Sequence, residues 1–157
     1  ILGSGSNSRL YRALVVDKRV AVSAGAWYES SALDTSKFGI AGSPREGVTL
    51  PQLESEIDAV IAQVIATGVT AGELERTKSR LIADAIYAQD SQASMARWYG
   101  AALTTGATVD DVLAWPGRIR AVTAAQVQQA AREWLDKKRS VTGYLIKDVG
   151  APVEKRS

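Results

Sequence analysis

The chain has 157 residues, of which 46% are hydrophobic and 23% are charged, and its formal net charge is +2. This is the usual composition of one globular domain, and no apolar run approaches the ~20 residues that a membrane-spanning helix needs. The sequence has no cysteine and no histidine, which excludes disulfides, cysteine nucleophiles, Ser–His–Asp catalysis and a histidine-ligated zinc site within this chain. We therefore expect no metal site, no complete catalytic site and no membrane span.

The basic residues and the first ten residues indicate neither a nucleic-acid partner nor a secretory signal. The one tight basic run, Lys137-Lys138-Arg139, lies at the end of an expected helix, where cations favour the helix dipole. Residues 1–10 lack the basic start, the apolar stretch and the small-residue cleavage site of a secretory signal. We therefore expect no nucleic-acid partner, and the compartment stays open.

The first part of the chain predicts a glycine-rich turn, a short helix and two strands. Ser8 is expected to cap the short helix, over residues 9–14. Residues 20–28 and 37–42 alternate between two faces, which is typical of strands. The polar segment between them predicts an antiparallel hairpin with a long loop.

Three capping boxes predict where helices start, because in each one a threonine and a residue three positions later satisfy free amides at the helix start. They are Thr49 with Gln52, Thr70 with Glu73, and Thr123 with Gln126. Apolar residues at helical spacing follow each box, and the first helix is expected to stop at Gly68. Further helices are predicted over residues 92–103 and 110–115, the second ended by Pro116-Gly117.

The last part of the chain predicts one more strand, over residues 141–146, and a polar, disordered tail over residues 147–157. Trp115 and Trp134 fall at apolar helical positions and are expected in the core, whereas Trp98-Tyr99 is expected at an interface. The order of elements predicts an α+β fold, with an antiparallel or mixed sheet and a block of helices packed on one face.

Three short motifs fall short of a functional pattern. The run Gly3-Ser4-Gly5-Ser6-Asn7-Ser8 lacks the Gly-Lys-Ser/Thr ending and the preceding strand of a phosphate-binding loop. Glu54 and Asp58 share a helical face that we interpret as a solvated surface and not as an acid–base pair. Lys78 and Ser79 are adjacent, so they point about 100° apart on a helix, and they lack the S-x-x-K spacing of a Ser–Lys dyad.

The start of the sequence predicts that the chain is a piece of a longer protein, because Ile1-Leu2-Gly3 is typical of a helix end whose body is missing. Three stretches then carry a family resemblance: residues 1–14 with the strand over 20–28, residues 68–78, and Trp115-Pro116 with Ile119 and residues 122–127. Together they resemble the C-terminal domain of bacterial pitrilysin/insulinase-family peptidases, of the two-subunit type related to mitochondrial processing peptidase. The resemblance covers residues 1–146 and implies a metallopeptidase-repeat-like domain truncated at its N-terminal side.

The resemblance implies that zinc is held by a preceding N-terminal domain, through an inverted His-x-x-Glu-His motif and a distal Glu, and that the motif's Glu acts as general base. None of these ligands can be placed on this chain, so no cofactor is expected in it. C-terminal domains of the family contribute an Arg and a Tyr, seven residues apart, that help to hold the substrate peptide. The matching positions here are Val15 and Val22, whose side chains cannot donate a hydrogen bond.

The expected function follows from this resemblance: a non-catalytic C-terminal domain of a zinc-dependent endopeptidase, inactive by itself, that forms part of a substrate chamber and a subunit interface. The missing Arg/Tyr pair predicts the zinc-bearing subunit of a heterodimer, whose partner subunit supplies Arg and Tyr to a peptide substrate. The alternative is a degenerate scaffold or assembly subunit without peptidase activity. Ser8, Arg9 and Tyr11 are expected to face the chamber or the domain junction, unless they serve in capping and packing.

Overall fold

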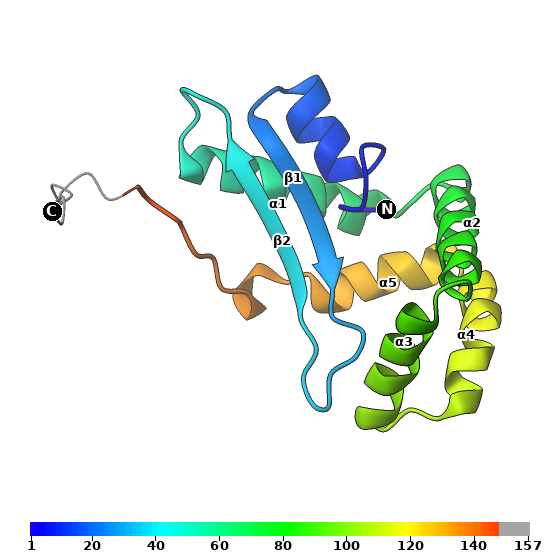
Figure 1. The fold of residues 1–157 in the computed structure, drawn as a ribbon. Helices are drawn as coiled ribbons and strands as arrows, with labels where there is room; N and C mark the ends of the chain where they lie inside the picture. Colours follow the sequence, from blue (N-terminus) through cyan, green and yellow to red (C-terminus); the bar gives the residue numbers. More distant parts are fainter. Residues whose placement is uncertain (148–157) are drawn as a thin grey trace, which may run out of the picture.

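The structure is a computed structural model that describes residues 1–147, so the predicted disordered tail lies outside the described residues except for Lys147. Its elements in chain order are η1 (Tyr11–Asp17), β1 (Ala21–Tyr28), β2 (Phe38–Pro44), α1 (Leu50–Thr67), α2 (Ala71–Ala88), α3 (Gln92–Thr104), α4 (Val109–Ala121), α5 (Ala124–Trp134) and η2 (Lys137–Arg139). Figure 1 shows α1 crossing behind the two strands, with α2, α3 and α4 grouped away from them. The α+β prediction is confirmed.

The two strands form the predicted antiparallel hairpin. Three pairs of residues that lie opposite each other on the two strands are on the side toward α1: Ala24–Gly42, Ala26–Ile40 and Tyr28–Phe38. A Cβ atom built at Gly42 would lie 3.3 Å from the Leu53 side chain of α1, which shows how closely the helix approaches this face. The intervening residues of both strands point to the opposite face, because side chains alternate along a strand.

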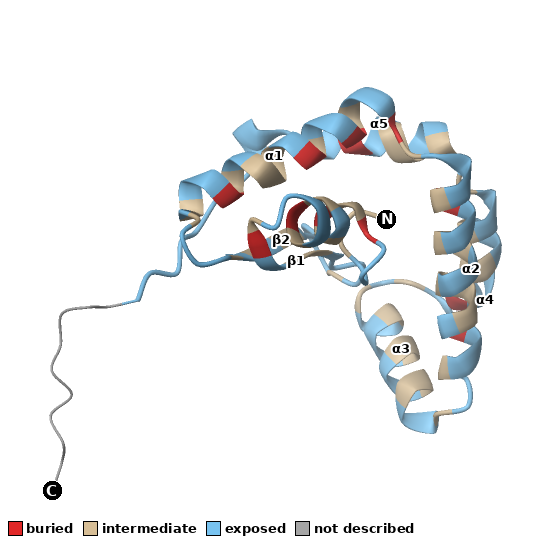
Figure 2. Ribbon diagram, turned by 90° about the horizontal axis from the view of Figure 1, so that it is seen from above, coloured by how far each residue is buried: buried red, intermediate tan, exposed pale blue. Residues whose placement is uncertain are grey.

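The core lies where η1 and α1 meet the sheet. Its buried apolar residues are Leu10, Leu14, Ala21, Leu53 and Val60. In Figure 2 the buried positions of α1 and α5 face inward, toward the rest of the molecule. Burial of each large side chain contributes roughly 1.5–3 kcal/mol, so these contacts fix η1 and α1 against the hairpin.

The capping boxes start the helices as predicted. In α1, α2 and α5, the threonine hydroxyl accepts a hydrogen bond from the backbone amide of the residue three positions later. The side chain of that later residue accepts a hydrogen bond from the backbone amide of the threonine. A fourth box, Thr108 with Asp111, starts α4. This box was not predicted, because Glu or Gln is the usual residue at the last position and Asp stands there instead.

The turn between α1 and α2 is set by Gly68, whose φ of 71° favours glycine. The two helices meet there at an angle of 106°. By length and hydropathy no single helix within residues 1–147 qualifies as a membrane span, and α1 and α2 qualify only when they are taken together as this bent pair.

The remaining helices divide into two groups. α5 packs against α1, and its Gln128 donates hydrogen bonds to the carbonyl oxygens of Ile65 and Ala66, at 3.1 and 2.9 Å. α2, α3 and α4 form an arm, defined here as residues 71–121, in which Trp98 and Trp115 pack edge to face with ring centroids 5.8 Å apart. No residue of α3 is buried.

Two predictions about the later helices are wrong. α4 does not stop at Pro116 but continues to Ala121, although proline inside a helix costs about 3 kcal/mol. Trp115 and Ile119, on either side of the proline, are both partly buried, so tertiary packing favours one continuous helix. Trp134 is not in the core: it is 60% exposed, and Arg139 lies over its ring at 5.0 Å from the centroid.

The predicted last strand is also wrong. Residues 141–146 form no regular secondary structure, and within the described chain no backbone hydrogen bond joins them to another segment. Alternating apolar and polar residues form a strand only where a neighbouring strand pairs with them or a packed surface covers their apolar side chains. Here the hydroxyl groups of Thr142 and Tyr144 donate hydrogen bonds to Glu54 of α1 instead.

Candidate functional site

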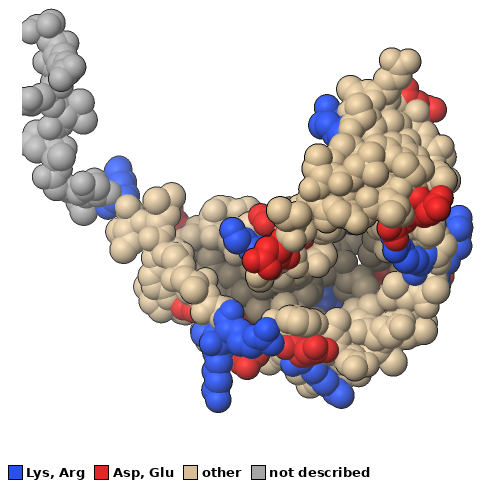
Figure 3. Space-filling model, turned by 90° about the horizontal axis from the view of Figure 1, so that it is seen from below, with Lys and Arg blue, Asp and Glu red and all other residues tan. Residues whose placement is uncertain are grey.

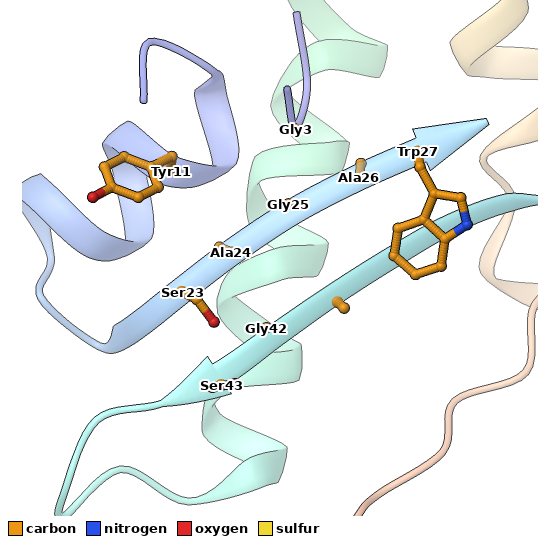
Figure 4. Close-up of a pocket in the computed structure, with 10 residues that line it drawn as sticks. Gly3, Tyr11, Ser23, Ala24, Gly25, Ala26, Trp27, Gly42 and Ser43 are labelled. Carbon is orange, nitrogen blue, oxygen red and sulfur yellow. The ribbon is translucent and has the colours of Figure 1, made fainter. Parts of the chain in front are cut away.

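The face of the hairpin opposite α1 carries a hollow of about 440 Å³. Tyr11 of η1 and Trp27 of β1 stand at its two ends, and Figure 4 shows the short side chains of β1 between them. The floor consists of small residues, among them Ser23, Gly25 and Ala41. The hollow therefore offers two aromatic surfaces, hydroxyl groups and strand backbone.

Two glycines shape this face through close approaches. The Trp27 ring crosses Gly39 on the neighbouring strand so closely that a Cβ atom there would lie 2.3 Å from the ring. Gly3 lies against β1: a Cβ atom there would lie 1.8 Å from the Ala26 nitrogen, and the Gly3 carbonyl oxygen accepts the Ala26 amide at 3.3 Å. Only residues without a side chain fit at these two positions, so the hollow depends on both.

Of the three residues singled out from the sequence, Tyr11 alone lines this hollow. Ser8 is buried, with 3% of its surface exposed. Its hydroxyl has no hydrogen-bond partner among protein groups of the described chain, so the expected side-chain cap is not formed. The carbonyl oxygen of Ser8 accepts the Arg12 amide at 2.9 Å instead, and Ser8 serves in packing.

Arg9 lies at a junction between the N-terminal segment and α2. Its Nε and Nη2 atoms each donate to one carboxylate oxygen of Glu73, both at 2.8 Å. These hydrogen bonds, with further ones from Thr70, lower the pKa of Glu73 to about 2, and Glu73 in turn raises the pKa of Arg9. Arg80 of α2 donates to the Ser4 hydroxyl at 2.7 Å. The side chain of Arg9 therefore holds two parts of this chain together.

A second hollow, of about 400 Å³, lies beside this junction and is lined by Arg9, Arg12 and Glu73. Its charges are of both signs, and the Arg9 side chain is already paired. Figure 3 shows the underside of the molecule, where basic and acidic side chains are interspersed and most of the hollowed surface is uncharged. This distribution favours neither an anion site nor a cation site.

Within residues 1–147 the structure shows neither a candidate metal site nor an Arg/Tyr pair at positions 15 and 22. No group of three or more Asp, Glu, His or Cys residues there could hold a metal ion. Val15 is half-buried in η1, and Val22 is exposed at the start of β1, beside the register shift. The lowered pKa of Glu54, about 2, is set by hydrogen bonds from Tyr144, Thr142 and Lys137, which suits a fixed acceptor and not a general acid.

Trp27 and the small residues of the hollow were missed in the sequence analysis. The sequence showed that residues 20–28 alternate between two faces, but not which face would be covered. Ala24 and Ala26 prove to pack against the core. The odd-numbered positions Ser23, Gly25 and Trp27 hold the signal that was available: two small residues and one large aromatic on the other face. Tyr11 joins them only in the folded chain.

Comparison with known proteins gives one family and several similar structures. The family model described as the peptidase M16 inactive domain matches residues 1–81, which is just over half of the chain. No curated protein matches.

Three solved structures share the fold. The inactive peptidase domain of a candidate zinc protease from Bordetella parapertussis is 18% identical with a TM-score of 0.84, covering 98% of this chain and 81% of that one. A candidate zinc protease from Bordetella pertussis Tohama I is 19% identical with a TM-score of 0.80, covering 94% and 81%. A protease from Helicobacter pylori is 22% identical with a TM-score of 0.79, covering 87% of this chain but 32% of that one. The present chain thus spans about a third of the Helicobacter pylori protease.

Proposed function

Because this chain belongs to the family of peptidase M16 inactive domains, we propose that it is the non-catalytic C-terminal domain of a zinc-dependent endopeptidase. In this role it forms one wall of a chamber that confines an unfolded peptide. The domain extends over residues 1–146, and the parent protein places a zinc-bearing domain before it. The isolated chain neither binds catalytic zinc nor cleaves peptide.

The observation that carries this proposal is the hairpin face with its hollow. The face is not covered by α1, it is floored by small residues, and it presents Tyr11 and the half-exposed Trp27. Such a surface contacts apolar side chains and peptide groups without a requirement for one sequence, because aromatic rings supply area at a low cost in side-chain entropy. A chamber wall needs these properties, since positioning of the peptide is its contribution to the reaction.

Zinc and the peptide-holding Arg/Tyr pair come from elsewhere in the assembly. The zinc domain of the same protein supplies the metal, which activates a water molecule for attack on the peptide bond. A second family subunit supplies Arg and Tyr, because Val15 and Val22 stand at the matching positions of this chain and have no polar side-chain atom. The arm supports contact with that subunit: Tyr87, Leu103 and Leu113 are large apolar residues exposed on it.

The test uses the full-length parent, alone and mixed with its partner subunit. Bound zinc is measured in each preparation, together with cleavage of an unstructured peptide. We expect zinc in the parent and activity only in the mixture. Trp27→Ala and Tyr11→Ala should each raise KM severalfold without changing the zinc content, whereas Trp134→Ala, which removes an exposed tryptophan from α5, should leave KM unchanged. An equal effect of all three substitutions would contradict a role for the hollow.

The scaffold function is the second candidate, and the same sequence difference supports it to the same degree. The absence of the Arg/Tyr pair from residues 15 and 22 is equally expected in a subunit that has lost its catalytic parts. This candidate predicts that the parent binds no catalytic zinc and that neither the parent nor the mixture cleaves peptide. It also predicts that Trp27→Ala alters subunit assembly or nothing at all.

A further inference from the structure

The hollow on the hairpin face is uncharged, although it opens to solvent. Among residues 1–147, the ten that line it include no Asp, Glu, Lys or Arg. The second hollow, of similar volume, has four charged residues among its nine: Arg9, Arg12, Asp17 and Glu73. In the whole chain 23% of the residues are charged. The lack of charge is therefore a feature of this hollow and not of the surface in general.

Trp27 is held in place at one end of the hollow. Its ring rests on Gly39 of β2, where an added Cβ atom would lie 2.3 Å from the ring, and yet Trp27 is 52% exposed. The strand backbone thus covers part of the indole, and the rest faces solvent. A ring that is already fixed offers apolar area to a ligand with little further loss of side-chain freedom.

The floor between Trp27 and Tyr11 leaves room for a large side chain of a bound peptide. Gly25 and Ala41 lie opposite each other on the two strands, and both line the hollow. Figure 4 shows only short side chains on β1 between the two rings. The volume of about 440 Å³ is at the lower end of the range of roughly 300–1,000 Å³ for small-ligand sites. The hollow therefore fits a few side chains and not a folded element.

The polar groups of the hollow are neutral and suit a peptide main chain. Ser23 and Ser43 lie opposite each other on the two strands and line the hollow. Each hydroxyl can donate or accept a hydrogen bond, so the two serines can bind a peptide group in either orientation. An ionised side chain in the same place would lose water without gaining an opposite charge, which is unfavourable. The hollow thus has partners for a peptide group and for an apolar side chain, but none for a charge.

We propose that the hollow selects peptide segments by charge: it binds a large apolar side chain, aromatic or aliphatic, between Tyr11 and Trp27, and it discriminates against an ionised side chain at this position. This selection rests on the proposed function, in which the hairpin face meets an unfolded peptide. It acts in substrate binding and not in the step that breaks the peptide bond, so it changes KM and not kcat.

Binding is measured in the full-length parent labelled with fluorotryptophan, after a chelator has removed zinc so that no peptide is cleaved. The fluorine resonances of Trp27 and Trp134 are assigned by their loss in Trp27→Phe and Trp134→Phe. The probes are Gly/Ser-rich peptides of one sequence with a single guest residue: Phe, Leu, Glu or Lys. The Phe and Leu peptides should shift the Trp27 resonance and bind about tenfold more tightly than the Glu and Lys peptides. The Trp134 resonance is the internal control, because this tryptophan is 60% exposed on α5 and should not shift.

A charge placed in the floor gives a second variant. Ala41 is exposed, and Ala41→Glu should reverse the preference, because the new carboxylate pairs with the Lys guest and loses water against the Phe guest. Ala125→Glu adds the same charge at an exposed position of α5 and should keep the preference for Phe. An unchanged Trp134 resonance shows that each variant is folded. Equal affinity of the four peptides for the parent, or a Trp27 resonance that does not respond to them, overturns the proposal.

Cleavage assays separate this selection from the peptidase function itself. The zinc-loaded parent, mixed with its partner subunit, should cleave the Phe and Leu peptides with a higher kcat/KM than the Glu and Lys peptides. Cleavage of all four with equal kcat/KM would keep the peptidase function and contradict the selection. Selective binding at Trp27 without any cleavage would keep the selection and contradict the peptidase function.

Discussion

Arg9 binds both carboxylate oxygens of Glu73, a residue 64 positions further along the chain. The same carboxylate accepts the Thr70 amide at 2.8 Å and so completes the capping box of α2. One side chain therefore both starts a helix and ties the N-terminal segment to it. Arg80 makes a second tie between the two, to Ser4, so the first turn of the chain and α2 form one structural unit.

The two roles of Glu73 can be separated by substitution. Glu73→Gln keeps a capping acceptor, as Gln52 and Gln126 do in α1 and α5, and should lower the unfolding free energy by about 1 kcal/mol through loss of the charged pair. Glu73→Ala should cost about 1 kcal/mol more, because the cap is lost as well. Urea unfolding measures both values. If the two variants are equally stable, the cap and the ion pair are not distinct contributions.

The unfolding free energy should fall at acidic pH as the carboxylate of Glu73 becomes protonated. The pKa of Glu73 is lowered in the folded chain from its ordinary value of 4.5 to about 2, chiefly by the Arg9 hydrogen bonds. Its contribution is therefore complete above pH 4.5 and is lost as pH falls toward 2. Urea midpoints should decline over this range, and less steeply in Glu73→Gln. Glu75→Gln, which alters an exposed neighbour on α2, should decline like the parent chain.

The helix starts could be predicted from the sequence because capping is local. Thr49, Thr70 and Thr123 each find their partner within three residues, so no knowledge of the fold is needed. The end of α4 could not be predicted, since continuation through Pro116 depends on where Trp115 and Ile119 pack. Local signals marked a helix end there, and tertiary packing of the arm outweighed them.

The candidate site was predictable only in part, for a similar reason. Tyr11 was singled out, but Trp27 stands on another element, and the two line the same hollow only because η1 packs beside β1. Arg9 pairs with Glu73 within this chain, and this partner could not be identified from the sequence because 64 positions separate the two residues. Residues 141–146 show the converse: they have a strand pattern without a strand, because within residues 1–147 no strand edge pairs with them.

A strained residue after η1 offers a stabilising substitution. Arg19 has a φ of 54°, a left-handed conformation that costs a residue with a Cβ atom roughly 1 kcal/mol. Its side chain is exposed, so little is lost with it. Arg19→Gly should raise the unfolding free energy by about 0.5 kcal/mol, the gain from relieved strain being partly offset by the greater freedom of the unfolded chain. Asp17→Gly, within η1, should instead destabilise the protein by about 1 kcal/mol. A loss of stability with Arg19→Gly would contradict the strain argument.

The contact between Trp27 and Gly39 predicts that the effect of Gly39→Ala on the unfolding free energy depends on whether Trp27 is present. Gly39→Ala alone should lower the unfolding free energy by about 1 kcal/mol, because the new Cβ atom would lie 2.3 Å from the indole and must displace the ring into solvent. In a Trp27→Ala background the same substitution should be neutral or stabilising by about 0.5 kcal/mol, since alanine is a better strand residue than glycine once the ring is gone. Urea unfolding of the four chains gives the coupling energy, and tryptophan fluorescence of Gly39→Ala should shift toward that of an exposed indole. An equal cost of Gly39→Ala in both backgrounds would show that the ring does not rest on this glycine, and the hollow would then have a different end wall.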